Sequence, residues 1–221
     1  MQRLLEGVHR FQDEEFGKYK AMFRRLSRQG QKPHTLFITC ADSRVLAELI
    51  TQSNPGDLFV IKNVGNIVPP GDRFESPNST GAGIEFAVEV LGVSDIVVCG
   101  HSDCGALAAL MGPKRDSNLR HLDQWIETAA PVRDLIETNY QHLKTDAERM
   151  RAAEEENVLF AIERLHTYAG VRRRLAEGSL RLHAWFFKIA TGDLFAYEPA
   201  QKQFVSITRP ENGGGTSGAT T

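Results

Sequence analysis

The sequence FITCADSRV, residues 37–45, changes character within a few positions. An apolar run ends at Cys40, and the polar residues Asp42 and Arg44 follow it directly. Open parallel sheets hold their sites in this way, because ligands reach polar groups in the crevice outside the carboxyl ends of the strands. The segment therefore predicts a buried strand that ends in reactive side chains, and Cys40 is a core residue, a nucleophile or a metal ligand there.

Composition limits the function classes. At 221 residues the chain can bury one large core, and a net charge of -2 with 24% charged residues is ordinary for a soluble globular protein. There is no basic excess to favour nucleic acid or an anionic membrane, so we expect neither partner. No segment reaches the roughly 20 apolar residues of a membrane span, and the amino terminus lacks a secretory signal pattern, so we expect a cytoplasmic protein. In a reducing compartment, the 3 cysteines favour core, ligand or nucleophile roles over a disulfide framework.

The hydrophobic pattern predicts alternating helices and strands. From Leu4 to Leu26 apolar residues recur every three or four positions, which indicates an amphipathic helix that Gly17 can divide in two. Pro33 excludes further helix, and the β-branched and aromatic residues after it indicate a first strand. The predicted elements from there are a strand over 35–40, a helix over 43–52, a strand over 57–64, a loop over 65–80, a helix capped by Ser79 or Thr80 and closed by Gly92, and a strand over 96–99.

The carboxyl-terminal half is predicted to be helical over most of 118–171, with interruptions near Pro131 and Thr145. Two strand-like runs follow, 180–189 and 194–198, and a turn joins them into a hairpin at the sheet edge. The alternation of strands and helices predicts an α/β fold with a mainly parallel central sheet flanked by helices on both faces, and with this C-terminal edge hairpin. We expect a single domain over 1–209 and a flexible tail over 210–221.

Two of the predicted strands end in potential metal ligands. Cys40 ends the first, and His101 and Cys104 follow the third. Zinc binds thiolate and imidazole in a tetrahedron, and three protein ligands leave the fourth position for water or a labile side chain. An H-x-x-C pair alone is also typical of a strand-end histidine beside a buried cysteine, and it is the addition of Cys40 that favours a metal site.

Asp42 and Arg44 allow two interpretations on spacing alone. In one, Asp42 caps a helix and Arg44 forms a surface ion pair of little energetic weight. In the other, Arg44 holds the Asp42 carboxylate beside the metal, where the carboxylate accepts a hydrogen bond from bound water or occupies the fourth position itself. Spacing does not separate the two.

The motif C-x-D-S-R-V at residues 40–45, followed later in the chain by H-S-x-C-G at 101–105, resembles the beta-class carbonic anhydrases, in their plant-like branch of bacterial type. The segments GDLFVIKNVGNIVPP and GAGIEFAVEVLGVSDIVVCGHSDCGAL resemble the same family, and the likeness extends from about Leu4 to Phe204. The resemblance implies the family's α/β fold, one zinc ion per subunit, and the reversible hydration of carbon dioxide to bicarbonate and a proton.

Carried over by position, the resemblance implies that Cys40, His101 and Cys104 hold the zinc and that Asp42 and Arg44 form the catalytic pair. The family also has a closed form, chiefly at lower pH, in which the aspartate leaves its arginine and binds the zinc. The sequence leaves open which form this chain adopts.

The resemblance also implies a substrate pocket. Gln31 matches a glutamine that donates a hydrogen bond to bicarbonate, and Phe59, Val64, Phe86 and Gly105 match other positions of that pocket. Many relatives carry a tyrosine at the position of Phe86, so any role of that hydroxyl is absent from this chain.

The implied mechanism begins with zinc, which lowers the pKa of bound water from about 15.7 to about 7 and so provides hydroxide to attack carbon dioxide. The resemblance further implies a homodimer, or a tetramer or octamer, in which the N-terminal helical arm over 1–30 packs on a partner subunit. Two alternatives remain. One is a related zinc hydrolase that acts on carbon disulfide or carbonyl sulfide, against which Gln31 argues, and the other is a non-catalytic zinc-binding scaffold that Asp42 closes permanently.

The other notable residues have structural interpretations. We expect Cys99 to be a small buried hydrophobe, the aromatic run 185–187 to belong to the core or to a dimer contact, and the acidic run 154–156 to form a solvated helix face. We expect the carboxylate of Asp103 to face solvent.

Overall fold

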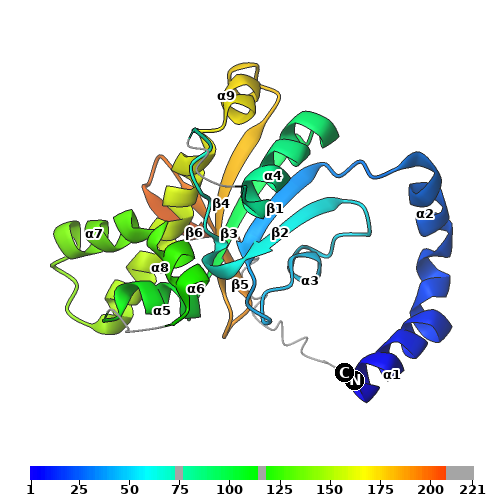
Figure 1. Ribbon diagram of the computed structural model, residues 1–221, viewed down its shortest axis with the longest axis horizontal. Coiled ribbons are helices and arrows are strands. Elements are labelled where there is room, and N and C mark those ends of the chain that lie inside the picture. Colours follow the sequence, from blue (N-terminus) through cyan, green and yellow to red (C-terminus); the bar gives the residue numbers. More distant parts are fainter. Residues whose placement is uncertain (73–76, 114–117, 208–221) are drawn as a thin grey trace, which may run out of the picture.

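The computed structural model describes residues 1–72, 77–113 and 118–207 (Figure 1). The predicted tail over 210–221 lies outside these residues. A six-stranded sheet forms the centre, with the strand order β2-β1-β3-β4-β5-β6. The strands are β1 (Thr35–Cys40), β2 (Leu58–Asn63), β3 (Asp95–His101), β4 (Arg181–Lys188), β5 (Asp193–Glu198) and β6 (Gln203–Ser206).

The sheet is parallel on one side and antiparallel on the other. β1 lies between β2 and β3 in parallel, with Cys40 opposite Asn63, and β3 is parallel to β4. β4 and β5 form the predicted hairpin, and β6 adds one further antiparallel strand that the sequence pattern did not predict. The mainly parallel α/β fold is therefore confirmed, with β6 as the outer strand beyond the hairpin.

β1 is buried at all its positions and contributes to a core on each face of the sheet. Successive side chains of a strand point to opposite faces. Leu36 and Ile38 join the larger core, whereas Phe37 packs with Ala47 and Val97 on the other face. The helices of these two faces are α4 (Ser79–Glu85), η3 (Phe86–Leu91), α8 (Asp146–Leu165) and α9 (Ala169–Ala176) on the first and α3 (Ala47–Thr51) on the second.

A further core lies at the carboxyl ends of the strands. Cys40, Ile67 and Cys104 pack there against apolar residues of α8 and of three shorter helices. Those helices are α5 (Gly105–Met111), α6 (Arg120–Glu127) and α7 (Ala130–Asn139). The end of the sheet at which reactive residues were predicted is thus enclosed by helices on one side.

Two predicted helix starts are wrong, and both errors involve turns. The helix predicted over 43–52 begins only at Ala47, because the residues before it form the turn that carries Arg44. Asn78, rather than Ser79 or Thr80, caps α4, since its side chain accepts a hydrogen bond from the amide of Gly81 at 2.6 Å.

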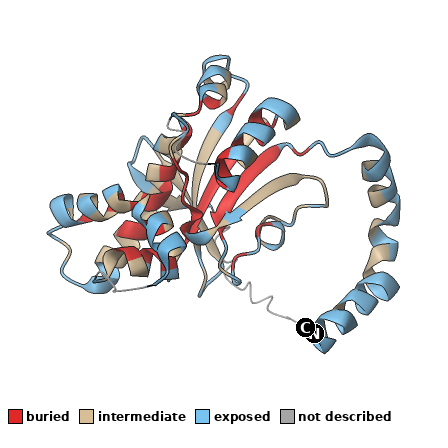
Figure 2. Ribbon diagram, viewed as in Figure 1, coloured by how far each residue is buried: buried red, intermediate tan, exposed pale blue. Residues whose placement is uncertain are grey.

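The arm, residues 1–30, contains α1 (Gln2–Arg10), η1 (Phe11–Glu15) and α2 (Phe16–Gln29), which follow one another directly. Gly17 lies inside α2 and does not divide the helix. The arm is largely exposed and stands away from the sheet (Figure 2). Near the carboxyl end of the arm, Leu26 lies against Gly56 of the same chain. Among the described residues, no helix is long and apolar enough to cross a membrane.

Candidate metal centre

Three potential metal ligands meet at the carboxyl ends of β1 and β3. Cys40 is the last residue of β1, His101 is the last residue of β3, and Cys104 directly precedes α5. One ligand atom from each lies within 4.8 Å of the others, and all three residues are buried. The structure therefore brings together the three residues that the sequence predicted as zinc ligands.

The imidazole of His101 is oriented with one nitrogen toward this group. Its Nδ1 lies 2.9 Å from the carbonyl oxygen of Ser102, which makes Nδ1 the protonated nitrogen and leaves Nε2 as the one with a lone pair. Nε2 is buried and has no hydrogen-bond partner of ordinary geometry among the described residues. A buried polar atom without a partner is costly, and a metal ion would satisfy it.

The two thiols interact, and this moves their pKa values in opposite directions. The pKa of Cys40 is lowered, chiefly because the thiol of Cys104 donates a hydrogen bond to its sulfur, while the pKa of Cys104 is raised by that same bond and by burial. The amide of Gly65 also donates to the Cys40 sulfur, at 3.3 Å. A thiolate at Cys40 is the form that binds zinc, and metal binding would release the proton from Cys104.

The loop after β2 is held against this group by side chains from distant helices. The indole of Trp125 donates to the carbonyl of Val64 at 2.7 Å, and the amide of Asn157 donates to the carbonyl of Gly65 at 2.9 Å. Gly65 has a positive φ of 81°, and a side chain there would come within 3.0 Å of Ala106. The position therefore favours glycine, which lets the backbone approach Cys40 closely.

Glu154 is a part of the site for which the sequence interpretation was wrong. Predicted on a solvated helix face, it is 4% exposed and accepts a hydrogen bond from the amide of Cys104 at 2.9 Å. Burial raises the pKa of this carboxyl, against the opposing effect of the Cys104 amide. The sequence did contain a signal for the burial of Glu154. Val158 and Leu165, which are four and eleven residues further along the helix, lie on the same face and are both buried.

Asp42 and Arg44 form a close pair beside the group. The guanidinium of Arg44 donates from Nε to Oδ1 of Asp42 at 2.9 Å and from Nη2 to Oδ2 at 2.7 Å, and the backbone amide of Arg44 donates to Oδ1 at 2.8 Å. These bonds hold the pKa of Asp42 well below its usual range. Both carboxylate oxygens of Asp42 are therefore directed at Arg44, and the carboxyl is ionised at neutral pH.

The backbone of Asp103 also contacts the Asp42–Arg44 pair. Nη2 of Arg44 donates to the carbonyl of Asp103 at 3.1 Å, and Asp103 has a positive φ of 58°. The loop between His101 and Cys104 therefore orients Arg44 directly. Spacing could not predict this, because the contact uses a carbonyl oxygen and depends on an uncommon backbone conformation.

The predicted substrate residues lie in two places. Val64 and Gly105 are next to the metal group, since one precedes Gly65 and the other follows Cys104. Phe59 lies four residues before Asn63, and Asn63 is the register partner of Cys40. Four residues of a strand span about 13 Å, so Phe59 is about that far along the sheet from Cys40.

Phe86 and Gln31 lie on the side of Phe59. The ring of Phe86 is 5.8 Å from that of Phe59, and Gln31 precedes the amino end of β1, opposite to the end that carries Cys40. Within one chain these predicted pocket residues do not meet the metal group.

The remaining residues behave as structural ones. Cys99 is fully buried inside β3, and burial raises the pKa of its thiol to about 12. Phe186 is fully buried in the sheet, with the guanidinium of Arg151 lying 3.9 Å from its ring centre. Neither belongs to the metal group.

A family model and individual known proteins that resemble this chain point to the same family. Residues 35–194 match the family model described as carbonic anhydrase. A carbonic anhydrase from Synechocystis sp. is 40% identical over 207 residues, which cover 93% of this chain and 74% of the relative. The residues matched by the family model run from the start of β1 to the first residues of β5 and include both strands that end in metal-ligand candidates.

Solved structures show the same fold. The beta-carbonic anhydrase CcaA superposes with a TM-score of 0.87 and 39% identity, covering 93% of this chain and 98% of that one. A tetrameric beta-carbonic anhydrase from Sordaria macrospora superposes with a TM-score of 0.79 and 31% identity, covering 88% and 95%.

Proposed function

The chain belongs to the beta-class carbonic anhydrase family, and we propose that it catalyses the reversible hydration of carbon dioxide to bicarbonate and a proton with one zinc ion per subunit. The single observation that carries this proposal is the buried group of Cys40, His101 and Cys104, in which Nε2 of His101 has no hydrogen-bond partner among the described residues. Two sulfurs and one imidazole nitrogen are ligands that zinc prefers.

The donor set fits a catalytic zinc better than a structural one. A structural site is closed by four protein ligands, whereas three leave a position for water. Among the described residues no fourth Cys, His or acidic side chain belongs to the group. Zinc bound there would supply Lewis acidity that lowers the pKa of a bound water from about 15.7 to about 7.

Asp42 and Arg44 would orient the attacking water. The Asp42 carboxylate is ionised and its position is set by Arg44, so it accepts a hydrogen bond from the water and directs a lone pair of the water at the substrate. Val64 and Gly105 would border the substrate with apolar surface, which suits an uncharged molecule such as carbon dioxide.

A homodimer would reconcile the two locations of the predicted substrate residues. Gln31, Phe59 and Phe86 lie apart from the metal group of their own chain, so they can serve substrate only at the site of another copy. Phe86 is 41% exposed and available for such a contact.

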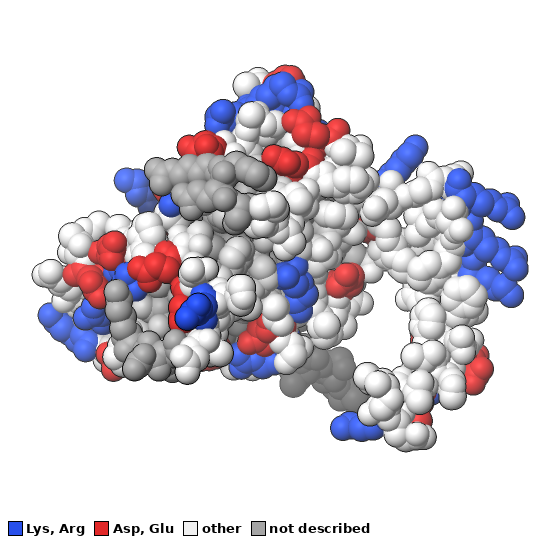
Figure 3. All heavy atoms as spheres, viewed as in Figure 1, with Lys and Arg blue, Asp and Glu red and all other residues white. Residues whose placement is uncertain are grey.

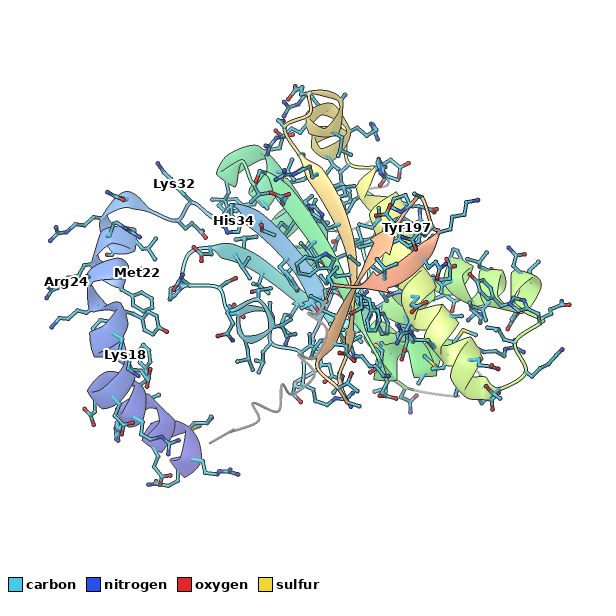
Figure 4. The ribbon with its side chains drawn as sticks, turned by 180° about the vertical axis from the view of Figure 1, so that it is seen from behind. Lys18, Met22, Arg24, Lys32, His34 and Tyr197 are labelled. Atoms are coloured by element: carbon cyan, nitrogen blue, oxygen red, sulfur yellow. The ribbon has the colours of Figure 1, made fainter. Side chains whose placement is uncertain are left out.

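The arm has the surface that such an assembly requires. Leu4, Val8 and Phe11 are 70%, 52% and 44% exposed, and a second copy would remove this apolar surface from water. Basic side chains gather on the outer side of the arm (Figure 3), and Met22 lies on the side toward the sheet, with Arg24 on the opposite side (Figure 4). The relative from Sordaria macrospora is tetrameric.

Deletion of residues 1–29 should therefore dissociate the assembly. We expect the intact chain to sediment as a dimer or larger particle of 24.6 kDa subunits and the shortened chain to sediment mainly as a monomer. Sedimentation velocity at equal protein concentration measures this. Identical sedimentation of the two chains would refute the role of the arm.

The catalytic proposal is tested with carbon dioxide, carbon disulfide and carbonyl sulfide in parallel. Stopped-flow assays across pH should show hydration of carbon dioxide by the zinc-loaded protein, loss of activity after chelation and recovery on adding zinc. Turnover confined to the sulfur substrates would favour the related hydrolase. A stoichiometric zinc content with no turnover at any pH would favour the scaffold.

A further inference from the structure

Lys62 lies on the edge strand β2 and contacts the turn over 42–45, which carries Asp42 and Arg44. Its ammonium group donates to the carbonyl of Val45 at 2.6 Å and to the carbonyl of Asp42 at 3.1 Å. Lys62 forms no ion pair within residues 1–72, 77–113 and 118–207. Its charge is therefore directed at these two carbonyl oxygens, which makes both hydrogen bonds charge-assisted.

The two carbonyls define the shape of the turn. The amide of Val45 donates back to the carbonyl of Asp42 at 3.2 Å, which closes the turn, and Val45 is fully buried below it. The amide of Ala41 donates to the carbonyl of Asn63 at 2.7 Å and makes a second tie to β2. Lys62 thus binds both ends of the turn at once, whereas the Ala41 amide holds only its start.

The turn sets the direction of the Asp42 carboxylate. Asp42 follows Cys40 by two residues, and both of its carboxylate oxygens accept hydrogen bonds from Arg44. The carboxylate is therefore close to two competing partners, the guanidinium and the metal group. A change in the backbone between Asp42 and Val45 would rotate it from one toward the other.

We propose that Lys62 is a positioning residue that holds the turn over 42–45 in the conformation in which Asp42 faces Arg44 and leaves the fourth metal position free. The inference rests on the proposed function, because it assigns Lys62 a part in keeping that site open. Both hydrogen bonds of the Lys62 ammonium go to backbone carbonyls, so it acts on Asp42 through the backbone of the turn.

Three variants test this role. Lys62→Met keeps the aliphatic stem and removes the donors, and Lys62→Arg keeps a cation that can donate to both carbonyls. Lys188→Met is the matched control, because Lys188 is also an exposed strand lysine but lies on β4. Each is prepared with zinc, and its metal content is measured by elemental analysis.

The expected result combines activity with amide hydrogen exchange. In Lys62→Met we expect kcat for carbon dioxide to fall about tenfold, as for the loss of a charged hydrogen bond, with zinc retained. The amides of Arg44 and Val45 should exchange faster, because both are bonded within the turn. For Lys62→Arg we expect a kcat and amide exchange rates between those of Lys62→Met and the wild-type protein. Lys188→Met should behave as the wild-type protein.

Each other outcome overturns the inference. Unchanged exchange at Arg44 and Val45 in Lys62→Met would show that Lys62 does not hold the turn, even if activity fell. Faster exchange with full activity would show that the held turn does not matter for catalysis. Failure of the proposed function is distinguishable, because the wild-type protein itself would then lack hydration activity while the exchange comparison would still report on the turn.

Discussion

Hydration of carbon dioxide should fall roughly 100-fold when Arg44 is replaced by alanine, while the protein keeps its zinc. Arg44 bonds both carboxylate oxygens of Asp42, at 2.9 and 2.7 Å, and it also bonds the carbonyl of Asp103. Its loss frees Asp42 to rotate, so the acceptor that orients the attacking water is no longer positioned. Asp42→Ala should have a similar effect, since it removes the acceptor itself.

Stopped-flow hydration and elemental analysis of the same samples measure this prediction. Arg173→Ala is a suitable control, because Arg173 forms an exposed ion pair with Glu89 at 2.7 Å and lies on α9. Full activity in Arg44→Ala or Asp42→Ala would remove the pair from the mechanism. Loss of zinc in either variant would instead assign that residue a role in holding the metal.

Replacement of Cys40 by serine should release the zinc and abolish hydration. A serine hydroxyl remains protonated at neutral pH, whereas the Cys40 thiol has a lowered pKa and offers a thiolate. Only Cys104 and His101 would then remain, and two ligands do not retain zinc against a chelator. Elemental analysis after dialysis should find almost no zinc.

Cys99→Ala provides the control for this experiment. Cys99 is fully buried but lies outside the metal group, so its replacement should cost about 1 kcal/mol of stability and leave the zinc content unchanged. An unchanged zinc content in Cys40→Ser would exclude Cys40 from the ligand set. Equal zinc loss in both variants would indicate general destabilisation instead.

The sequence predicted those parts of the fold that depend on local pattern. β1 and β3 are apolar runs that stop at polar residues, so the strands and the sheet edge at which Cys40 and His101 meet could be inferred. Parallel pairing follows from the helices between the strands. Cys104 could be added to this group because it lies only three residues after His101.

Contacts between distant segments could not be predicted in this way. Lys62 donates to the carbonyl of Asp42, and Asp103 accepts from Arg44 through its own carbonyl, so both contacts use backbone oxygens that carry no residue signature. Glu154 was assigned to a solvated face because it stands in an acidic run, although its spacing places it on the buried side of α8. β6 has only four residues, too few for a clear alternation of apolar and polar positions.

The pairing of the strands determines where the predicted substrate residues lie relative to the metal group. Positional resemblance grouped Gln31, Phe59 and Phe86 with Val64 as one pocket, but the pairing of β1 with β2 sets Phe59 far along the strand from Cys40. A motif carried over by position gives residue roles without saying which subunit provides each residue. Only the three-dimensional arrangement separates the two places.

Zinc K-edge X-ray absorption of the wild-type protein examines the metal centre itself. We predict two sulfur ligands at about 2.3 Å and one imidazole nitrogen at about 2.0–2.1 Å, with one further light atom, as expected from Cys40, His101 and Cys104 and an open fourth position. A shell with four sulfur or imidazole ligands, or with no sulfur, would contradict the assignment of this group as the catalytic zinc site.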